Sequence, residues 1–176
     1  AGNQVVVVVS AMGDTTDDLI ELSRKVNTSP GARELDMLLS TGEQISISML
    51  AMTLNAMGYP AISLTGRQAG FHTDGTFSKA KILSIDNQRV KKELDAGKIV
   101  VVAGFQGVDD NGEVNTLGRG GSDTSAVALA VALNADVCEI FTDVDGVFTA
   151  DPRIVKTAWK MPEISYDEML EMAAMG

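Results

Sequence analysis

The chain has 176 residues, and its 14 lysine and arginine residues against 24 aspartate and glutamate residues give a formal net charge of −10 with the single histidine neutral. This acidic balance argues against a nucleic acid or an anionic membrane surface as partner, and 45% hydrophobic with 22% charged residues is typical of an ordinary globular domain. The lone Cys138, the lone histidine and the absence of a Cys-x-x-Cys spacing argue against disulfide scaffolds, zinc sites and Cys/His proteases, and favour a reducing, cytoplasmic location.

Two continuous valine-rich runs, Val5 to Val9 and Ile99 to Val102, predict strands that are covered on both faces in a parallel sheet. The first run is far too short for a membrane span and follows no basic stretch, so it predicts neither a span nor a signal peptide. Because the chain starts without methionine directly before a strand, we expect it to be a piece of a longer protein.

Helices are predicted where apolar residues recur at helical spacing. The predicted helices cover Asp17 to Val26, Glu34 to Met57, Asn87 to Asp95, Ser122 to Asn134 and Ser165 to Met175, and further strands are expected at Ala61 to Leu64 and Glu139 to Thr142. This order predicts an α/β fold, a three-layer α/β/α sandwich with a mainly parallel central sheet, in one domain over residues 1–176. The glycine- and threonine-rich stretch Ala69 to Lys79 suits an exposed loop or hairpin, with His72 as a solvated loop residue.

Ligands of open α/β sheets bind at the carboxyl ends of the strands, so the loops that follow the strands are the candidate sites. The richest loop runs from Thr116 to Ser125 and reads Thr-Leu-Gly-Arg-Gly-Gly-Ser-Asp-Thr-Ser. Glycines before a helix N-terminus leave free N–H groups for a phosphate or carboxylate, and Arg119 adds a two-point donor. The alternative is that Ser122 or Asp123 only caps the helix. The loop is not a Walker A loop, because the chain contains no Gly-x-x-x-x-Gly-Lys-Ser/Thr sequence. It is not a dinucleotide fingerprint either, because Asp123 stands at the position of the third glycine.

A second cluster follows the predicted strand at Glu139 to Thr142. In it, Asp143 and Asp145 are placed to orient a metal or a ribose, and Arg153 is placed to meet phosphates. The alternative is an Asp-Gly turn at Asp145 followed by a proline-bounded loop.

Glu43 stands beside Gly42, where the helical periodicity is interrupted. A carboxylate at this point is suited to receive the ammonium group of an amino acid. The alternative is a first-turn glutamate that the helix dipole favours.

Five motifs, in the order in which they stand here, resemble those of aspartate kinases, members of the amino acid kinase superfamily. They are Ser10-Ala11-Met12-Gly13, Leu38-Leu39-Ser40-Thr41-Gly42-Glu43, Val102-Ala103-Gly104-Phe105-Gln106-Gly107, Leu117-Gly118-Arg119-Gly120-Gly121-Ser122-Asp123-Thr124 and the run from Thr142 to Arg153. The resemblance implies transfer of the γ-phosphoryl group of Mg-ATP to the side-chain carboxylate of L-aspartate, giving 4-phospho-L-aspartate for lysine, threonine and methionine synthesis. A carboxylate with a pKa near ~3.9 is already ionised at neutral pH, so the acceptor needs no general base. Catalysis then consists of positioning and charge neutralisation.

The resemblance also implies a role for each matching residue. Glu43 would bind the substrate ammonium, Arg119 with Gly120, Gly121 and Ser122 would hold its carboxylates, Phe105 would line the aspartate pocket and Asp123 would orient catalytic groups; Thr142, Asp143, Phe148, Thr149, Ala150, Asp151, Pro152 and Arg153 would lie on the nucleotide side. ATP and Mg²⁺ are the implied cofactors, no residue is assigned as a metal ligand, and the full-length parent is expected to be a homo-oligomer.

Relative to the family, the chain starts after the strand of the type Lys-Phe-Gly-Gly-Thr-Ser and stops before an Ala-Lys-Val stretch and the regulatory ACT domains. The expectation is therefore a partial catalytic domain that is weakly active or inactive by itself. Two alternatives remain open: another amino acid kinase, such as a glutamate or acetylglutamate kinase, and a non-catalytic module that binds nucleotide or amino acid.

Overall fold

The structure is a computed structural model that describes the backbone of residues 2–142 and 144–175 and the side chains up to Met172. The chain divides into two compact units, Ala1–Cys138 and Glu139–Gly176.

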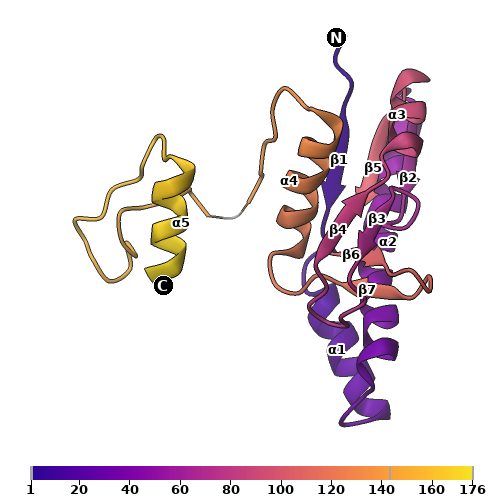
Figure 1. The fold of residues 1–176 in the computed structure, drawn as a ribbon, viewed down its shortest axis with the longest axis horizontal. Coiled ribbons are helices and arrows are strands. Elements are labelled where there is room, and N and C mark those ends of the chain that lie inside the picture. The colour runs from indigo at the N-terminus through magenta and orange to yellow at the C-terminus, as the bar shows by residue number, and fades with distance from the viewer. Residues whose placement is uncertain (1, 143, 176) are drawn as a thin grey trace. The chain divides into compact units, whose positions relative to one another are not determined.

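The first unit contains most of the regular structure (Figure 1). Its elements are β1 (Val6–Val9), α1 (Thr15–Val26), α2 (Ala32–Ala56), β2 (Ala61–Leu64), β3 (Phe71–Thr73), β4 (Ile82–Ile85), α3 (Gln88–Asp95), β5 (Ile99–Ala103), β6 (Gln106–Val108), β7 (Val114–Thr116) and α4 (Gly121–Leu133).

The larger core is built on a three-stranded parallel sheet with the order β1-β5-β2. Val6 of β1 pairs with Val100 of β5, and Ala61 of β2 pairs with Ile99. Both valine-rich runs are therefore strands of one parallel sheet, as the sequence predicts.

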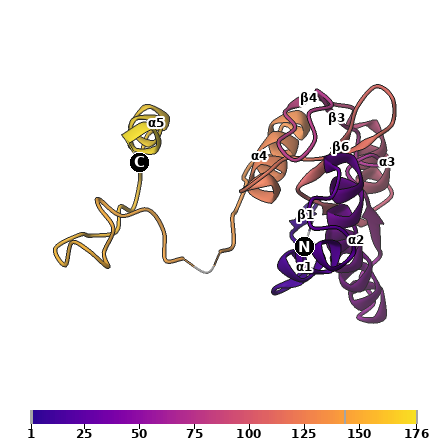
Figure 2. The ribbon, with the colours of Figure 1, turned by 90° about the horizontal axis from the view of Figure 1, so that it is seen from below.

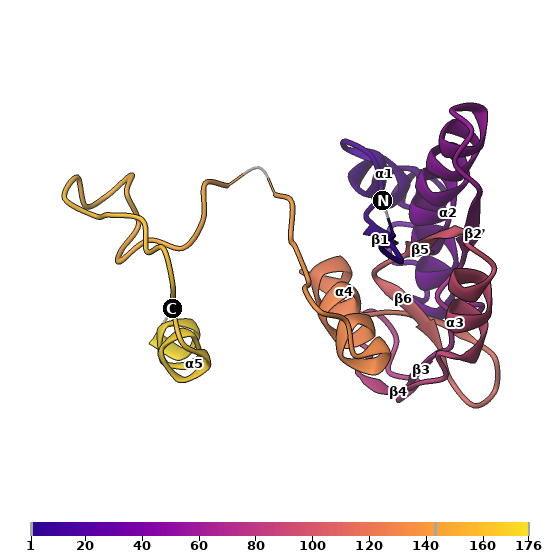
Figure 3. The same cartoon turned by 90° about the horizontal axis from the view of Figure 1, so that it is seen from above.

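Successive side chains of β5 point to opposite faces of this sheet, and helices cover both faces. Val100 and Val102 pack in the core that α3 and α4 cover, whereas Val101 and Ala103 pack in the core that α2 covers. Figures 1 and 3 show α4 and α2 on opposite sides of β1 and β5. The predicted three-layer α/β/α arrangement is confirmed.

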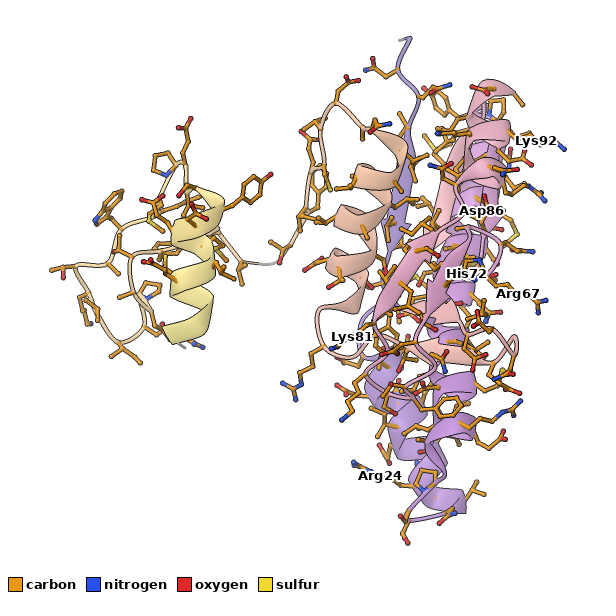
Figure 4. The ribbon with its side chains drawn as sticks, viewed as in Figure 1. Arg24, Arg67, His72, Lys81, Asp86 and Lys92 are labelled. Atoms are coloured by element: carbon orange, nitrogen blue, oxygen red, sulfur yellow. The ribbon has the colours of Figure 1, made fainter. Side chains whose placement is uncertain are left out.

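A second sheet, with the order β4-β3-β6-β7, was not expected from the sequence. β3 pairs antiparallel with β4 and parallel with β6, and β6 pairs antiparallel with β7. The stretch predicted as a loop or hairpin is thus partly a hairpin strand, in which Phe71 and Thr73 are buried. His72 is exposed as predicted, but it lies on β3 rather than in a loop (Figure 4).

The second unit contains α5 (Tyr166–Met175), which the sequence predicts, and an antiparallel bridge between Phe148 and Lys160. α5 begins with a capping box, since Ser165 Oγ donates to Glu168 Oε2 at 2.7 Å and Glu168 N donates to Ser165 Oγ at 3.3 Å. The rest of this unit is irregular chain, and Figure 2 shows its course in a second view.

The strand predicted at Glu139 to Thr142 is wrong. The structure gives these four residues no strand, and no ladder partner for them is found in the described part of the chain. Phe141 is 91% exposed. An apolar run becomes a strand only where a neighbouring strand satisfies its backbone groups.

No helix in the described stretches is long and apolar enough to cross a membrane.

Candidate functional site

The loops that follow β1 and β5 meet at one edge of the parallel sheet. Gly104 N donates to Val9 O at 3.0 Å, which joins the two strand ends. A Cβ on Gly104 would lie 2.8 Å from both Cβ and Oγ of Ser122, so only glycine lets the first turn of α4 approach this closely. The carboxyl edge of the sheet and the start of α4 therefore form one locus.

The first turn of α4 has no side-chain cap. Its N-cap is Gly120 in the left-handed conformation, with φ 69°, and no side chain bonds there, so the alternative that Ser122 or Asp123 caps the helix is wrong. Gly121 N donates to Gly118 O and Thr124 N to Gly120 O, but the N–H groups of Ser122 and Asp123 find no acceptor in the described chain. Two backbone donors and the positive end of the helix dipole are thus available to an anion.

Two charged side chains flank these donors. Arg119 and Asp123 are both exposed. Neither makes a hydrogen bond or an ion pair with any residue that the structure describes. A guanidinium without an internal partner beside free N–H groups can hold a carboxylate or phosphate.

Phe105 joins the same locus through its backbone. Its φ is 65°, which is rare for a residue with a side chain, and its N–H donates to Ser125 Oγ at 3.1 Å. A Cβ on Gly121 would lie 2.8 Å from Phe105 Cδ2. The structure therefore brings the predicted residues Phe105 and Gly121 into contact. Ser125, which was not singled out as a site residue, holds the strained backbone in place.

Glu43 lies in the middle of α2 rather than in a first turn, so the alternative for this residue is wrong. Its side chain is 2% exposed, and Oε1 accepts a hydrogen bond from Ala11 N at 3.1 Å in the loop after β1. Oε2 is buried and has no hydrogen-bond partner. Burial raises the pKa of Glu43, while the hydrogen bonds that it accepts from backbone N–H groups oppose the rise.

α2 passes close to this loop because residue 42 is glycine. A Cβ on Gly42 would lie 3.0 Å from Ala11 Cβ. The apparent break in periodicity at Gly42 is therefore a close approach within a continuous helix, and the approach places Glu43 against the end of β1.

The buried face of α2 carries further polar residues that were not predicted as site residues from the sequence motifs. Asp36 and Ser40 are both 0% exposed, and Gln106 Nε2 of β6 donates to Ser40 O at 2.9 Å. With Glu43 they follow the spacing i, i+4, i+7, which places them on one helix face. Asp36 and Ser40 could be identified from the sequence, because they are polar residues at helix positions where apolar residues are expected.

The residues predicted for the nucleotide side lie in the second unit. A hollow of about 530 Å³ is lined by Val144, Asp145, Gly146, Phe148, Ala150, Asp151, Pro152 and Arg153. Thr149 instead supports the local fold, since its N–H donates to Trp159 O at 3.1 Å. Thr142 is exposed, and Asp143 lies outside the described residues.

Arg153 and Asp151 are paired within this hollow. Arg153 Nη2 lies 2.8 Å from Asp151 Oδ2, and Arg153 N donates to Asp151 Oδ1 at 2.8 Å. The side-chain hydrogen bond from Arg153 is the main cause that lowers the pKa of Asp151. A ligand phosphate at Arg153 would therefore compete with Asp151.

Gly146, in the same hollow, has a φ of 137°, which residues with a side chain rarely adopt, but the structure shows no turn at Asp145 and Gly146, so the alternative of an Asp-Gly turn is not confirmed. A Cβ on Gly146 would lie 2.7 Å from Lys160 Cε. The side chain of Lys160, a residue outside the predicted motifs, therefore lies against Gly146.

Comparison with known proteins agrees with this arrangement. Residues 1–176 match the family described as "Amino acid kinase family". The chain is 62% identical to an aspartokinase of Bacillus sp. (strain MGA3) over 99% of its own length and 43% of that protein, and 58% identical to aspartokinase 2 of Bacillus subtilis (strain 168) over 99% and 43%. The chain thus spans less than half the length of these relatives.

Solved structures give the same picture. Aspartate kinase from Synechocystis is 55% identical with a TM-score of 0.82, over 99% of this chain and 29% of that one. E. coli aspartokinase III in complex with aspartate and ADP is 31% identical with a TM-score of 0.78, over 90% and 36%. An isopentenyl phosphate kinase at 20% identity and a TM-score of 0.66, over 96% and 68%, shares the fold.

Proposed function

This chain belongs to the amino acid kinase family, and from that premise we propose that it carries the aspartate site and part of the nucleotide site of an aspartate kinase. The reaction transfers the γ-phosphoryl group of Mg-ATP to the side-chain carboxylate of L-aspartate and yields 4-phospho-L-aspartate. The observation that carries the proposal is the edge of the parallel sheet where the uncapped first turn of α4, Arg119 and the unpartnered Oε2 of Glu43 gather around the ends of β1 and β5.

The acceptor is an amino acid with one ammonium and two carboxylate groups, and the site offers complementary charges. Glu43 Oε2, buried without a partner, is suited to an ammonium group, which would satisfy it and offset its desolvation. Arg119 and the free N–H groups at Ser122 and Asp123, presented by Gly120 and Gly121, are suited to the carboxylates. Phe105 would form an apolar wall beside Gly121.

Asp123 would orient groups around the transferred phosphoryl rather than remove a proton. The acceptor carboxylate is ionised at neutral pH, so no base is required. The exposed carboxylate of Asp123 stands in the first turn of α4, beside the free N–H groups of that turn.

The nucleotide side would involve the hollow of the second unit, with Phe148, Thr149, Ala150, Asp151, Pro152 and Arg153, together with Thr142 and Asp143. Mg²⁺ would enter as part of the Mg-ATP substrate. Release of Arg153 from Asp151 would make the guanidinium available to phosphate oxygens.

The similar aspartokinases are longer than this chain, so properties of the whole protein are also part of the proposal. These properties are a role in lysine, threonine and methionine synthesis, a homo-oligomeric parent and a cytoplasmic location. Identities of 58–62% to proteins named aspartokinase support aspartate over glutamate or acetylglutamate as acceptor.

The test is ATP-dependent trapping of the acyl phosphate as its hydroxamate. L-aspartate, L-glutamate and N-acetyl-L-glutamate are offered to this chain and to a longer version that carries a Lys-Phe-Gly-Gly-Thr-Ser strand ahead of it. Hydroxamate from aspartate alone is the expected result. Product from glutamate or acetylglutamate instead would move the chain to another amino acid kinase, and nucleotide binding without product in either version would leave a binding module.

A further inference from the structure

Asp36 is a buried carboxylate on α2 whose oxygens are fully occupied by hydrogen bonds. It is 0% exposed. Oδ2 accepts from Ser78 N at 2.8 Å and Thr116 N at 2.9 Å, and Oδ1 accepts from Ser78 Oγ at 3.1 Å and Thr116 Oγ1 at 3.0 Å. No lysine or arginine pairs with it in the described part of the chain. Four donors, two of them backbone N–H groups, thus take the place of a counter-ion.

The two residues that donate to Asp36 come from different segments. Thr116 is the last residue of β7, directly before the glycine-rich loop that leads to α4, and Ser78 lies in the connection between β3 and β4. That connection is tied to β7 a second time, because Ala80 N donates to Thr116 O at 2.8 Å. Asp36 therefore joins α2, β7 and the β3–β4 connection at one point.

The backbone on both sides of this point is held in uncommon conformations. Ser78 has a φ of 65° and Gly118 a φ of 79°, and a Cβ on Gly118 would lie 3.3 Å from Ser78 O. A left-handed serine costs conformational energy, so it persists only where its surroundings hold it. The two hydrogen bonds from Ser78 to Asp36 do so, and the carbonyl of Ser78 then forms the surface against which the glycine-rich loop turns.

Asp36 stands seven residues before Glu43 on the same buried face of α2. One rigid helix thus reaches the loop after β1 through Glu43 and the start of the glycine-rich loop through Asp36. We propose that Asp36 is a positioning residue, whose carboxylate sets the glycine-rich loop from Gly118 to Gly121 in its anion-binding shape and in register with Glu43. The catalytic part of this inference rests on the proposed function, whereas the ordering of the loop can be tested without it.

Two substitutions separate hydrogen bonding from charge. Asp36→Ala removes all four acceptor contacts and leaves the buried N–H of Thr116 without a partner. Asp36→Asn can keep the network, because its carbonyl oxygen accepts from the two N–H groups while its NH₂ donates to the two hydroxyl groups, which are free to rotate.

The first measurement is amide hydrogen exchange over residues 116–122, with α3 as internal reference. We expect exchange in the loop to rise about tenfold in Asp36→Ala, to return close to the wild-type rate in Asp36→Asn and to stay unchanged in α3. The second is the affinity for aspartate against that for ATP. In Asp36→Ala we expect aspartate binding to weaken about tenfold and ATP binding to stay within about twofold, with rescue by Asp36→Asn.

Loop exchange and aspartate affinity that both remain within about twofold of wild type in Asp36→Ala would overturn the proposal. An Asn variant as impaired as the Ala variant would also overturn it, because the hydrogen bonds would then not be the cause. If Asp36→Ala does not fold, Thr116→Val replaces it, since it removes one hydroxyl donor and keeps the volume; an unchanged loop in that folded variant decides against the proposal. If the wild type binds no aspartate, the proposed function fails, while the exchange measurement still decides the role of Asp36.

Discussion

Glu43 Oε1 accepts a hydrogen bond from Ala11 N at 3.1 Å, which joins the middle of α2 to the loop after β1 and leaves Oε2 buried without a partner. A carboxylate in this position is half satisfied by the protein. A cation bound at Oε2 would stabilise this oxygen. Without a cation, the buried and unpartnered oxygen lowers the stability of the fold.

Replacement of Glu43 by glutamine should alter the pH dependence of stability. Burial raises the pKa of Glu43 above its unfolded value of about 4.3. Its contribution to the free energy of unfolding is therefore fully present below that pH and is lost as pH rises through the folded-state pKa. We expect the difference in Tm between Glu43→Gln and the wild type to increase in favour of the variant from about pH 4 to pH 7. Parallel Tm curves would contradict this assignment.

Replacement of Arg119 by alanine should weaken aspartate binding about tenfold or more, because a charge-assisted contact to a carboxylate is lost. Arg24→Ala is the matched control, since Arg24 is an exposed arginine in the last turn of α1 (Figure 4). ATP affinity should stay unchanged in both variants. Isothermal titration with each ligand measures the difference, and equal aspartate affinities in the two variants would remove Arg119 from the site.

In the full-length parent, Asp123→Asn should lower turnover about a hundredfold, since Asp123 is assigned to orient groups around the transferred phosphoryl. The change in Tm should be small because the side chain is exposed and makes no internal hydrogen bond in the described structure. Asp110→Asn, at an exposed position between β6 and β7, controls for the loss of one negative charge. Hydroxamate formation with saturating aspartate is the readout, and turnover equal to that of the control would contradict the role.

Gly104→Ala should destabilise the first unit by about 1–3 kcal/mol, because the added Cβ would stand 2.8 Å from the Cβ of Ser122. Gly31→Ala is the comparison, as a Cβ there meets nothing within 4 Å. Urea unfolding of both variants gives the two free energies. A Gly104 variant as stable as the Gly31 variant would show that α4 can move away from β5 without cost.

Glu93 provides a pH effect of opposite sign to that of Glu43. It accepts hydrogen bonds from Lys98 Nζ at 2.7 Å and Arg89 Nε at 2.8 Å, and the bond from Lys98 is the main cause that lowers its pKa. Its stabilisation is therefore present above the unfolded pKa of about 4.3 and is lost as pH falls through the folded value. Glu93→Gln should lower Tm at pH 7 and leave it unchanged near pH 2. An equal loss at both pH values would indicate a packing effect.

The parallel sheet and its helices could be predicted because each element carries its signal within itself. A run of five valines identifies β1, and apolar spacing identifies α2, almost to their observed ends. The second sheet could not be predicted in this way, since β3, β6 and β7 have three residues each and are stabilised by pairing between distant segments, such as His72 with Val108.

The candidate site shows the same division. The glycine-rich segment before α4 is predicted from composition. The absence of a side-chain cap is seen only in the structure, because the sequence also allows Ser122 or Asp123 to cap the helix. The contacts of Asp36 with Ser78 and Thr116 span 42 and 80 residues, and no local pattern encodes partners that far apart. Glu139 to Thr142 gives the opposite error, because its composition is strand-like but no described segment pairs with it.

The position of β1 at the edge of the parallel sheet has a consequence for biosynthesis. Among the residues that the structure describes, Val6–Val9 pairs only with β5, whose residues Ile99–Ala103 are translated about ninety positions later. At about 5–20 residues per second, the valine run waits on the order of 5–20 s on the ribosome before its partner exists. During that interval it is an exposed apolar strand without a ladder, the kind of segment that chaperones bind and that aggregates when they do not. The yield of folded protein should therefore depend on how fast translation reaches Ala103 and on how well the valine run is shielded until then.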